Sequence, residues 1–380
     1  MKIFIAGDYC PIGRIEEIIK KGKSEEVLLD IEKHIKESDL SIVNLESPLT
    51  DSNKLITKSG PNIKSSEIGL KPLEISGVKL ATLANNHILD FDEEGVKDTI
   101  DLCKSKNIDV VGAGKDLSEA RKPFYYTYND KKIAILNFAE NEYCAATEKS
   151  YGANPVNLIN NFNDINKAKE ESDFVIVIAH GGREHFQLPT PNQKERYRFY
   201  VDSGADLVVG HHSHCFSGYE EYKEKHIFYS LGNFVFDYKP KYQKGLWTLG
   251  YALDLSINFD TKKVDFEIIP FEQGKKENPI LNVLSGEKKQ EILEKVNELN
   301  EIIIDEKLYA EAWEKYIESQ VIGYKGMLFT KNMYIRALIS RGYLPKFLLT
   351  SSLKRKALFL NLFRCETHRE IMIDVLNKEL

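Results

Sequence analysis

The sequence contains few cysteines and no long apolar run. Its five cysteines, among 380 residues, are scattered and never stand in CxxC spacing, which argues against a disulfide framework and against a zinc ribbon. No apolar run approaches the roughly 20 residues that a membrane-spanning helix needs. Met1 and Lys2 lead directly into the first apolar run, which leaves no room for a signal peptide. We therefore expect a cytoplasmic protein, and the sequence also lacks short repeats and low-complexity segments.

Short apolar runs alternate with amphipathic segments along most of the chain, which is typical of βαβ units and of an α/β fold. A chain of 380 residues is long enough for one large α/β domain and an appendage. The predicted strands include Lys2–Ala6, Ser41–Val43, Leu80–Leu83, Phe174–Ala179 and Ala205–Val209. The predicted helices include Glu93–Ser105, Asn163–Glu171 and Gln193–Asp202. Two further strands, Leu249–Phe259 and Lys263–Phe271, are expected to form part of a second sheet.

Each of the first five strands is followed by side chains that bind metals. Open α/β sheets bind ligands at the carboxyl ends of their strands, so these side chains are expected to gather at one place. Carboxylate and amide oxygens combined with imidazoles suit Mn, Fe or Zn better than Ca. The sequence therefore predicts a site for one or two divalent transition metal ions. In chain order, the strand-end residues are Asp8, Glu46, Asn86 with His87, His180, and His211 with His212 and His214.

These strand ends belong to a set of motifs that resembles the bacterial capsule synthesis protein CapA family, which is associated with poly-γ-glutamate and other surface polymers. The resemblance extends over Gly7 to Asp237, about three fifths of the chain. That family belongs to the calcineurin-like metallophosphoesterase superfamily, which implies a four-layer α/β/β/α sandwich. The motifs are GD at Gly7, NLESP at Asn44, ANNH at Ala84 with Asp90, HGGRE at His180, GADLVVGHHSH at Gly204 and YSLGNFVFD at Tyr229.

The resemblance implies a role for each strand-end residue. Glu46 takes the place of the carboxylate that bridges two metals, and His87 matches the general acid that acts on the leaving oxygen. Asp90, three residues after His87, is placed to fix the tautomer of that histidine. The implied metal ligands are Asp8, Glu46, Asn86, His180, His212 and His214.

Four further residues are candidates for binding the substrate: Arg183, Glu184, His211 and Asn233. Arg183 is suited to neutralise an anionic substrate through two hydrogen bonds. His211 should point away from His212 along an extended segment, so a purely structural role is equally open. Asn233 has a turn role as its alternative.

Two departures from the family pattern stand out. Cys10 occupies the position where the superfamily usually has a metal-binding histidine, which puts full occupancy of two metal sites in doubt. A buried apolar role is the more common one for such a cysteine. The family usually has His-Trp-Gly-x-Glu-Tyr where this chain has His180 to His185, with Gly181 after the first histidine. This second change suggests an altered substrate pocket.

A polar loop, Asp51 to Ser66, is placed to cover the site from the side of Glu46. It contains Lys54, Lys58 and Lys64. These lysines suit a lid that attracts anions, and ordinary solvated lysines are the alternative.

We expect a catalytic domain at residues 1–273 and a mainly helical, basic extension at residues 274–380. A helical pattern runs from Glu287 to Ser319, and Lys331 to Arg364 holds eight Lys or Arg and no acidic residue. The total formal charge is −6, so the rest of the chain carries −14. This basic segment suits either an anionic membrane surface, at the inner membrane, or packing against the catalytic domain or another subunit. Nucleic acid is not the expected partner.

Two functions fit these observations. The first is a metal-dependent, phosphoesterase-like hydrolase in capsule, poly-γ-glutamate or other surface-polymer biosynthesis, acting on an anionic small molecule or polymer. The second is a non-catalytic assembly or export factor that uses the metal to bind an anionic polymer. The second function needs the metal ligands but not the general acid, so turnover separates the two.

Overall fold

The computed structural model describes residues 1–58, 60–329 and 333–345, and the chain divides into two compact units, Met1–Ile304 and Asp305–Leu380. The first unit contains every motif of the family resemblance. The expected division between residues 273 and 274 stays a prediction.

The first sheet of unit Met1–Ile304 has the strand order β16-β15-β14-β1-β2-β3-β4, with β13 also paired to β1. Its strands β1 to β4 run parallel, and β14 to β16 are antiparallel additions. Strand β1 extends past the predicted end at Ala6 and carries Asp8 near its carboxyl end, whereas β2 leads into Glu46 and β3 leads, after Leu83 and Ala84, to Asn85 and Asn86. The strands are β1 Lys2–Cys10, β2 Leu40–Leu45, β3 Leu80–Thr82, β4 Asp109–Val111, β13 Asn233–Phe236, β14 Leu249–Asn258, β15 Lys263–Glu272 and β16 Asn282–Val283.

Strands β14 and β15 correct one expectation from the sequence. Both were expected in the second sheet, but β14 pairs antiparallel with β1, from Lys2 opposite Ser256 to Ile5 opposite Leu253. The open edge of β1 offers unpaired backbone groups, and β14 satisfies them. Alternation of polar and apolar residues predicts a strand, but it does not identify the strand's partner.

The second sheet has the order β11-β12-β10-β9-β7-β6. Its central strand β9 is buried at all seven residues, as expected for a parallel strand covered on both faces. A two-stranded ribbon pairs β5 with β8. These strands are β5 Ala113–Gly114, β6 Phe124–Tyr128, β7 Lys131–Ala139, β8 Gly152–Ala153, β9 Phe174–His180, β10 Leu207–His211, β11 Tyr219–Tyr222 and β12 Lys225–Phe228.

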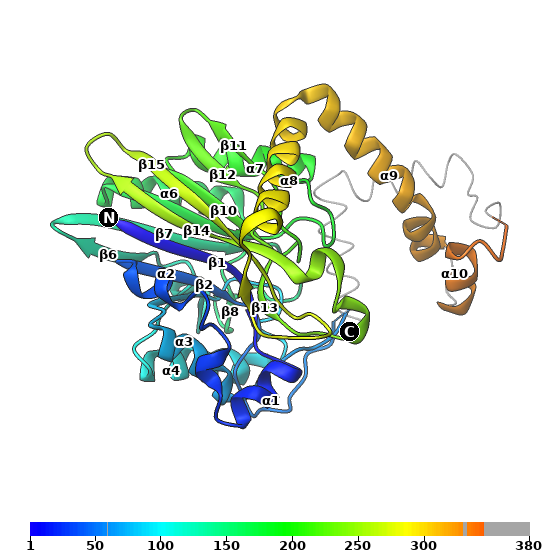
Figure 1. Ribbon diagram of the computed structural model, residues 1–380, viewed down its shortest axis with the longest axis horizontal. Coiled ribbons are helices and arrows are strands. Elements are labelled where there is room, and N and C mark those ends of the chain that lie inside the picture. The colour runs from blue at the N-terminus through cyan, green and yellow to red at the C-terminus, as the bar shows by residue number, and fades with distance from the viewer. Residues whose placement is uncertain (59, 330–332, 346–380) are drawn as a thin grey trace. The chain divides into compact units, whose positions relative to one another are not determined.

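Helices cover the outer face of each sheet, so the four-layer α/β/β/α sandwich is confirmed (Figure 1). Apolar residues of α1 to α4, such as Ile15, Leu73 and Val96, share one core with Phe4 and Val43 of the first sheet. Helices α6 and α7 contact strands of the second sheet. The helices are α1 Arg14–Lys20, α2 Glu32–Glu37, α3 Lys71–Ser76, α4 Asp92–Ser105, α5 Leu117–Ala120, α6 Leu158–Glu171, α7 Pro191–Asp202 and α8 Gly286–Ile304, with 3-10 turns η1 Ser24–Glu26, η2 Glu67–Leu70, η3 Pro240–Tyr242 and η4 Gly245–Thr248.

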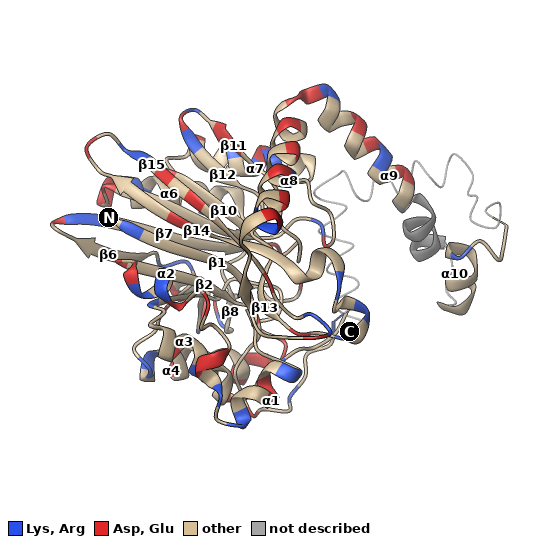
Figure 2. Ribbon diagram, viewed as in Figure 1, with Lys and Arg blue, Asp and Glu red and all other residues tan. Residues whose placement is uncertain are grey.

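Helix α8 contacts β11 and β15 through a stripe of buried residues that includes Ile292, Val296 and Ile303. Its other positions are rich in Glu and Lys (Figure 2). This is the pattern of an amphipathic helix with one buried face.

The helical pattern from Glu287 to Ser319 is interrupted at Asp305 rather than continuous. The Asp305 carboxylate accepts hydrogen bonds from the backbone N–H groups of Lys307 and Leu308, each 2.9 Å long, and so caps a new helix. In the second unit, α9 spans Glu306–Phe329 and α10 spans Met333–Ser340. Within the described residues, no helix has the length and apolar character needed to cross a membrane.

Most of the basic segment Lys331–Arg364 lies outside the described residues, namely residues 331, 332 and 346–364. Its contact with a membrane or a subunit stays a proposal.

Candidate metal centre

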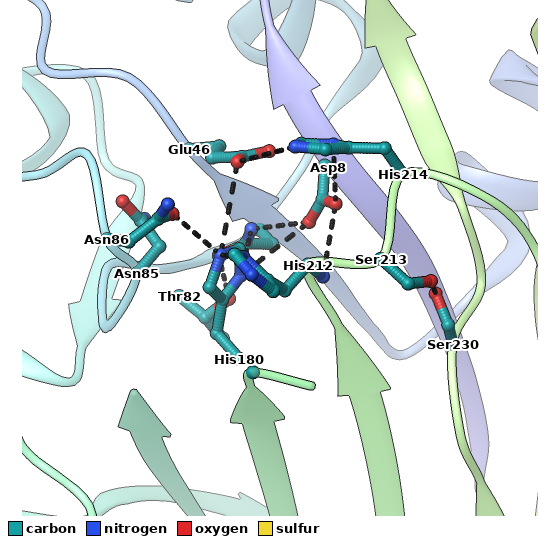
Figure 3. Close-up of polar contacts among 12 residues, drawn as sticks. Asp8, Glu46, Thr82, Asn85, Asn86, His180, His212, Ser213, His214 and Ser230 are labelled. Carbon is teal, nitrogen blue, oxygen red and sulfur yellow. Dashed lines mark hydrogen bonds and ion pairs between the residues drawn. The ribbon is translucent and has the colours of Figure 1, made fainter. Parts of the chain in front are cut away.

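The carboxyl ends of β1, β2, β9 and β10 meet where the two sheets face each other, and they bring five buried metal-binding side chains together (Figure 3). Figure 3 shows the carboxylates approaching from the first sheet and the imidazoles from the second. The five residues are Asp8, Glu46, His180, His212 and His214, and none is more than 4% exposed.

Asp8 reaches the centre because two backbones approach closely beside it. The Asp8 N–H donates to the carbonyl oxygen of Gly232 over 3.2 Å. A Cβ atom on Gly7 would lie 1.9 Å from that same oxygen, so a side chain cannot be accommodated there. The glycine of the GD motif and the glycine of the SLGNF segment therefore serve one backbone contact.

One group of donor atoms consists of Asp8, Glu46 and His214, whose nearest ligand atoms all lie within 4.8 Å of one another. The His214 Nε2 atom is 3.7 Å from Glu46 Oε1. His214 Nδ1 lies 2.9 Å from Asn233 Oδ1. Since an amide oxygen only accepts, this contact places a proton on Nδ1 and leaves the Nε2 lone pair for a metal.

A second group surrounds His180 Nε2. This atom lies 3.0 Å from Asn86 Oδ1, 3.1 Å from His212 Nδ1 and 3.9 Å from Glu46 Oε1. Atoms that share one ion at about 2.0–2.2 Å are separated by roughly 3–4 Å. Glu46 Oε1 therefore stands between the two groups, as a bridging carboxylate would.

The surroundings of the Glu46 carboxylate show whether a metal ion fits this centre. Both of its carboxylate oxygens are buried and have no hydrogen-bond partner among the described residues. Burial, and next the charge of Asp8, raises the pKa of Glu46 well above its usual value. A buried carboxylate without a partner is costly, and a bound cation would satisfy both oxygens. The donor set thus fits a divalent metal.

The ionisation of the other ligands agrees with this assignment. Burial raises the pKa of Asp8 to about 6, and hydrogen bonding from Asn44 opposes the shift. Burial, and then neighbouring imidazoles, lowers the pKa values of His180 and His214 well below their usual range. These imidazoles are therefore neutral at pH 7, which is the state that binds metals.

The turn that carries the imidazoles is strained. His212 and His214 have φ values of 98° and 54°, which side chains with a Cβ seldom adopt. Such strain is tolerated at functional sites where the surrounding structure fixes it. Here the His212 N–H donates to Asp8 Oδ2 over 3.3 Å.

Asn44 is a residue of the centre to which sequence reasoning gave no role. Its Nδ2 donates to Asp8 Oδ1 over 2.7 Å and lies 3.3 Å from His180 Nδ1, and its Oδ1 accepts from Thr82. Asn44 therefore orients a carboxylate of one sheet and lies next to an imidazole of the other. Its place in the NLESP motif, two residues before Glu46, is the signal in the sequence that could have found it.

His87 and Asp90 lie beside the second group. His87 Nδ1 is 2.6 Å from Asp90 Oδ2, which is the partnership that the sequence predicts. Asp90 is fully buried, and His87 is 7% exposed. Since Nδ1 is engaged, Nε2 is the ring atom left to exchange a proton with a ligand.

The predicted substrate-binding residues lie in different surroundings. Asn233 is buried and holds His214, as described above. His211 ends β10 with both ring nitrogens buried and without partners among the described residues, and burial lowers its pKa to about 3. Arg183 and Glu184 lie on the loop after β9, where Glu184 is exposed and its charge contributes to the raised pKa of Glu46. The assignment of all four to substrate stays a prediction.

Cys10 is buried in an apolar cluster with Ile63, Phe236 and Trp247. Burial and the nearby Glu46 raise the pKa of its thiol well above the usual value. A protonated thiol is a poor metal ligand. Cys10 accordingly lies outside the Asp8, Glu46 and His214 group, in keeping with its apolar role.

The sequence is similar to those of known capsule biosynthesis proteins. The chain is 34% identical over 242 residues to the capsule biosynthesis protein CapA of Bacillus anthracis, a match that covers 61% of this chain and 59% of the relative. It is 33% identical over 235 residues to the PGA biosynthesis protein CapA of Bacillus subtilis, covering 61% and 62%. The match thus spans about three fifths of the length of these curated relatives.

Among solved structures, a hypothetical protein from Thermus thermophilus aligns with a TM-score of 0.46 at 14% identity, over 72% of this chain and 99% of that one. The model of the family described as bacterial capsule synthesis protein PGA_cap matches residues 2–238, which include every candidate ligand of the centre. The chain therefore belongs to the bacterial capsule synthesis protein family PGA_cap.

Proposed function

We propose that this protein is a metal-dependent, phosphoesterase-like hydrolase that acts in the synthesis of a capsule, poly-γ-glutamate or a related surface polymer. The observation that carries the proposal is the buried Glu46 carboxylate, which has no hydrogen-bond partner among the described residues and stands between two groups of donor atoms. Membership of the capsule synthesis family supports the process, and the names of the relatives support the polymer.

Two divalent ions would be held by the two donor groups with Glu46 shared between them. When bound, they would supply a water of lowered pKa and neutralise charge on a phosphoryl oxygen. Asp8, His214 and Glu46 would hold one ion, and Glu46, Asn86, His180 and His212 the other. Cys10 adds no ligand to the first group, so that group offers fewer donors and we expect its ion to bind more weakly.

The chain's own residues would move the proton. The contact between Asp90 and His87 Nδ1 fixes the orientation of the imidazole, so that Nε2 of the doubly protonated ring can donate its proton to the leaving oxygen and leave the Nδ1–H form. Arg183, on the loop after β9, would neutralise an anionic substrate. The substrate class that follows is a phosphoester or an anionic polymer precursor.

Metal analysis combined with hydrolysis assays tests this proposal. Purified full-length protein, never exposed to chelator, should contain Mn, Fe or Zn at one to two equivalents. It should hydrolyse at least one of p-nitrophenyl phosphate, bis-p-nitrophenyl phosphate, a nucleotide sugar or a γ-glutamyl amide, and the His87→Asn variant should do so about 10²–10⁴-fold more slowly. Metal without turnover on any substrate of the panel would favour the alternative of a non-catalytic factor that binds an anionic polymer. Less than half an equivalent of metal would contradict both.

A further inference from the structure

We propose that Lys58, on the loop after β2, is a positioning residue for His87. It holds the Asp90 carboxylate in the orientation that binds the His87 ring, and it ties this pair to loop residues 51–58 and 60–66. The inference rests on the proposed function, because His87 is the general acid of that proposal. Lys58 was expected to be either a lid lysine that attracts anions or an ordinary solvated one. Its surroundings fit neither.

Lys58 is a buried cation. Its side chain is 4% exposed, although it comes from a polar surface loop. The Nζ atom forms an ion pair with Asp90 Oδ1, donates to the backbone oxygen of Asn86 over 3.2 Å and lies 3.3 Å from His87 Nδ1. One ammonium group therefore contacts the residue before His87, the ring of His87 and the partner of that ring.

The same loop binds Asp90 through three more groups. The Ile63 N–H donates to Asp90 Oδ2 over 2.7 Å. The Asn62 side chain and the Ile56 N–H donate to the backbone oxygen of Asp90 over 2.8 and 3.2 Å. Lys58 is the charged member of this set and the one that reaches Oδ1. Asp90 is thus a residue through which the loop contacts the turn that carries Asn86 and His87.

This arrangement has a physical consequence for His87. Asp90 Oδ2 is shared by His87 and Ile63, and Oδ1 is held by Lys58, so the carboxylate cannot rotate without losing a charged hydrogen bond. Without Lys58, a fully buried carboxylate would lose its cation, which is costly. The turn would then relax, and the imidazole would no longer be held in one orientation. Outer partners of this kind typically change activity by about 10–100-fold.

Lys54 provides a matched control on the same loop. Its side chain is 73% exposed and pairs with Asp92, at the start of α4. Exposed pairs of this kind contribute little to stability, because water screens the two charges. The variants Lys58→Met and Lys54→Met therefore remove the same charge at a buried and at an exposed position.

The experiment compares the full-length wild type with Lys58→Met, Lys58→Arg and Lys54→Met. Hydrogen exchange should quicken at least about tenfold in peptides covering residues 51–66 of Lys58→Met and remain unchanged in Lys54→Met. At a pH where the His87 ring is neutral, long-range ¹⁵N–¹H spectra should show a single Nδ1–H tautomer in the wild type and a mixture in Lys58→Met. Metal content should be the same in all variants, kcat on bis-p-nitrophenyl phosphate should fall about 10–100-fold in Lys58→Met, and Lys58→Arg should restore both readouts in part.

Unchanged exchange and an unchanged His87 spectrum in Lys58→Met would overturn the proposal. If Lys58→Met does not fold, the wild-type spectrum still tests the proposal. A mixture of His87 tautomers in the wild type would contradict a fixed Asp90–His87 pair. Hydrolysis enters only as the last readout. A wild type without turnover would thus contradict the hydrolase function while exchange and spectra still test Lys58.

Discussion

At the scale of single residues, the centre holds two carboxylates, Asp8 and Glu46, out of contact with water. In the metal-free protein their negative charges oppose folding, because burial penalises the ionised form. The arrangement of these carboxylates therefore costs stability in the absence of a cation, as functional sites often do.

The variant Asp8→Asn should stabilise the metal-free protein at high pH. Burial raises the pKa of Asp8 to about 6 from an ordinary value of 3.8, so between these pH values the folded state binds more protons than the unfolded state. Stability from this group is then lost as pH rises through that window. We expect a gain on the order of 1–3 kcal/mol at pH 8, shrinking toward pH 4.

Urea unfolding in the presence of chelator measures the free energy of unfolding of both proteins at each pH. His180 and His214 titrate with the opposite sign, since their pKa values are lowered. Their Nδ1 atoms lie 3.8 and 3.7 Å from the Asp8 carboxylate, so the substitution changes their contribution as well. Equal free energies of unfolding of the two proteins at pH 8 would show that burial of the Asp8 charge does not destabilise the fold.

Loss of His212 and loss of His87 should have different effects. His212→Ala removes a donor that lies 3.1 Å from His180 Nε2, so the protein should lose metal while its circular dichroism spectrum stays native. His87→Asn should keep the metal and lower kcat by about 10²–10⁴-fold. Elemental analysis and steady-state kinetics on the same preparations check this. Equal metal loss in both variants would refute the division of roles.

At the scale of elements, the contact between β1 and the segment before β13 decides where Asp8 lies. In Gly7→Ala, the new Cβ would need the place of the Gly232 oxygen, 1.9 Å away, so one of the two backbones must shift. We expect a loss of about 2–4 kcal/mol of stability and reduced metal content. Gly22→Ala is the comparison: φ is +77° there, but no atom lies within 4 Å of the new Cβ.

The Gly22 variant should cost only about 1 kcal/mol, the typical penalty of a left-handed conformation. Thermal or urea unfolding measures the stability of both variants, and elemental analysis measures their metal content. If Gly7→Ala is the milder change, the close approach of the backbones does not control the site.

The elements, and the gathering of most candidate ligands at one place, could be predicted from the sequence, because parallel strands deliver the residues at their carboxyl ends to one edge of a sheet. What could not be predicted depends on contacts between distant segments. The pairing of β14 with β1 is one case. The burial of Lys58 is another, since it follows from the path of a loop without regular structure. The partner of Asn233 is a third: the motif indicated the neighbourhood of the site, but His214 Nδ1 as its contact required the fold.

At the scale of the whole molecule, the centre and its supporting residues belong to the first compact unit, Met1–Ile304. A fragment of residues 1–304 should therefore fold alone and bind as much metal per chain as the full-length protein. It should also unfold within a few degrees of the full-length chain when both are metal-loaded. Differential scanning calorimetry and elemental analysis of the two proteins test this. A fragment without metal would show that residues 305–380 contribute to the centre.

The position of the centre between two sheets also determines when it can form. Asp8 and His214 are more than two hundred positions apart in the sequence, and they meet only after strands of both sheets are assembled and packed. Closing so long a loop is entropically expensive, so this contact belongs to the late part of folding. A metal ion therefore cannot serve as a nucleus for this chain, as it does in small zinc domains. A metal ion bound at this centre would enter a folded protein, and its uptake during refolding would report when the two sheets have packed together.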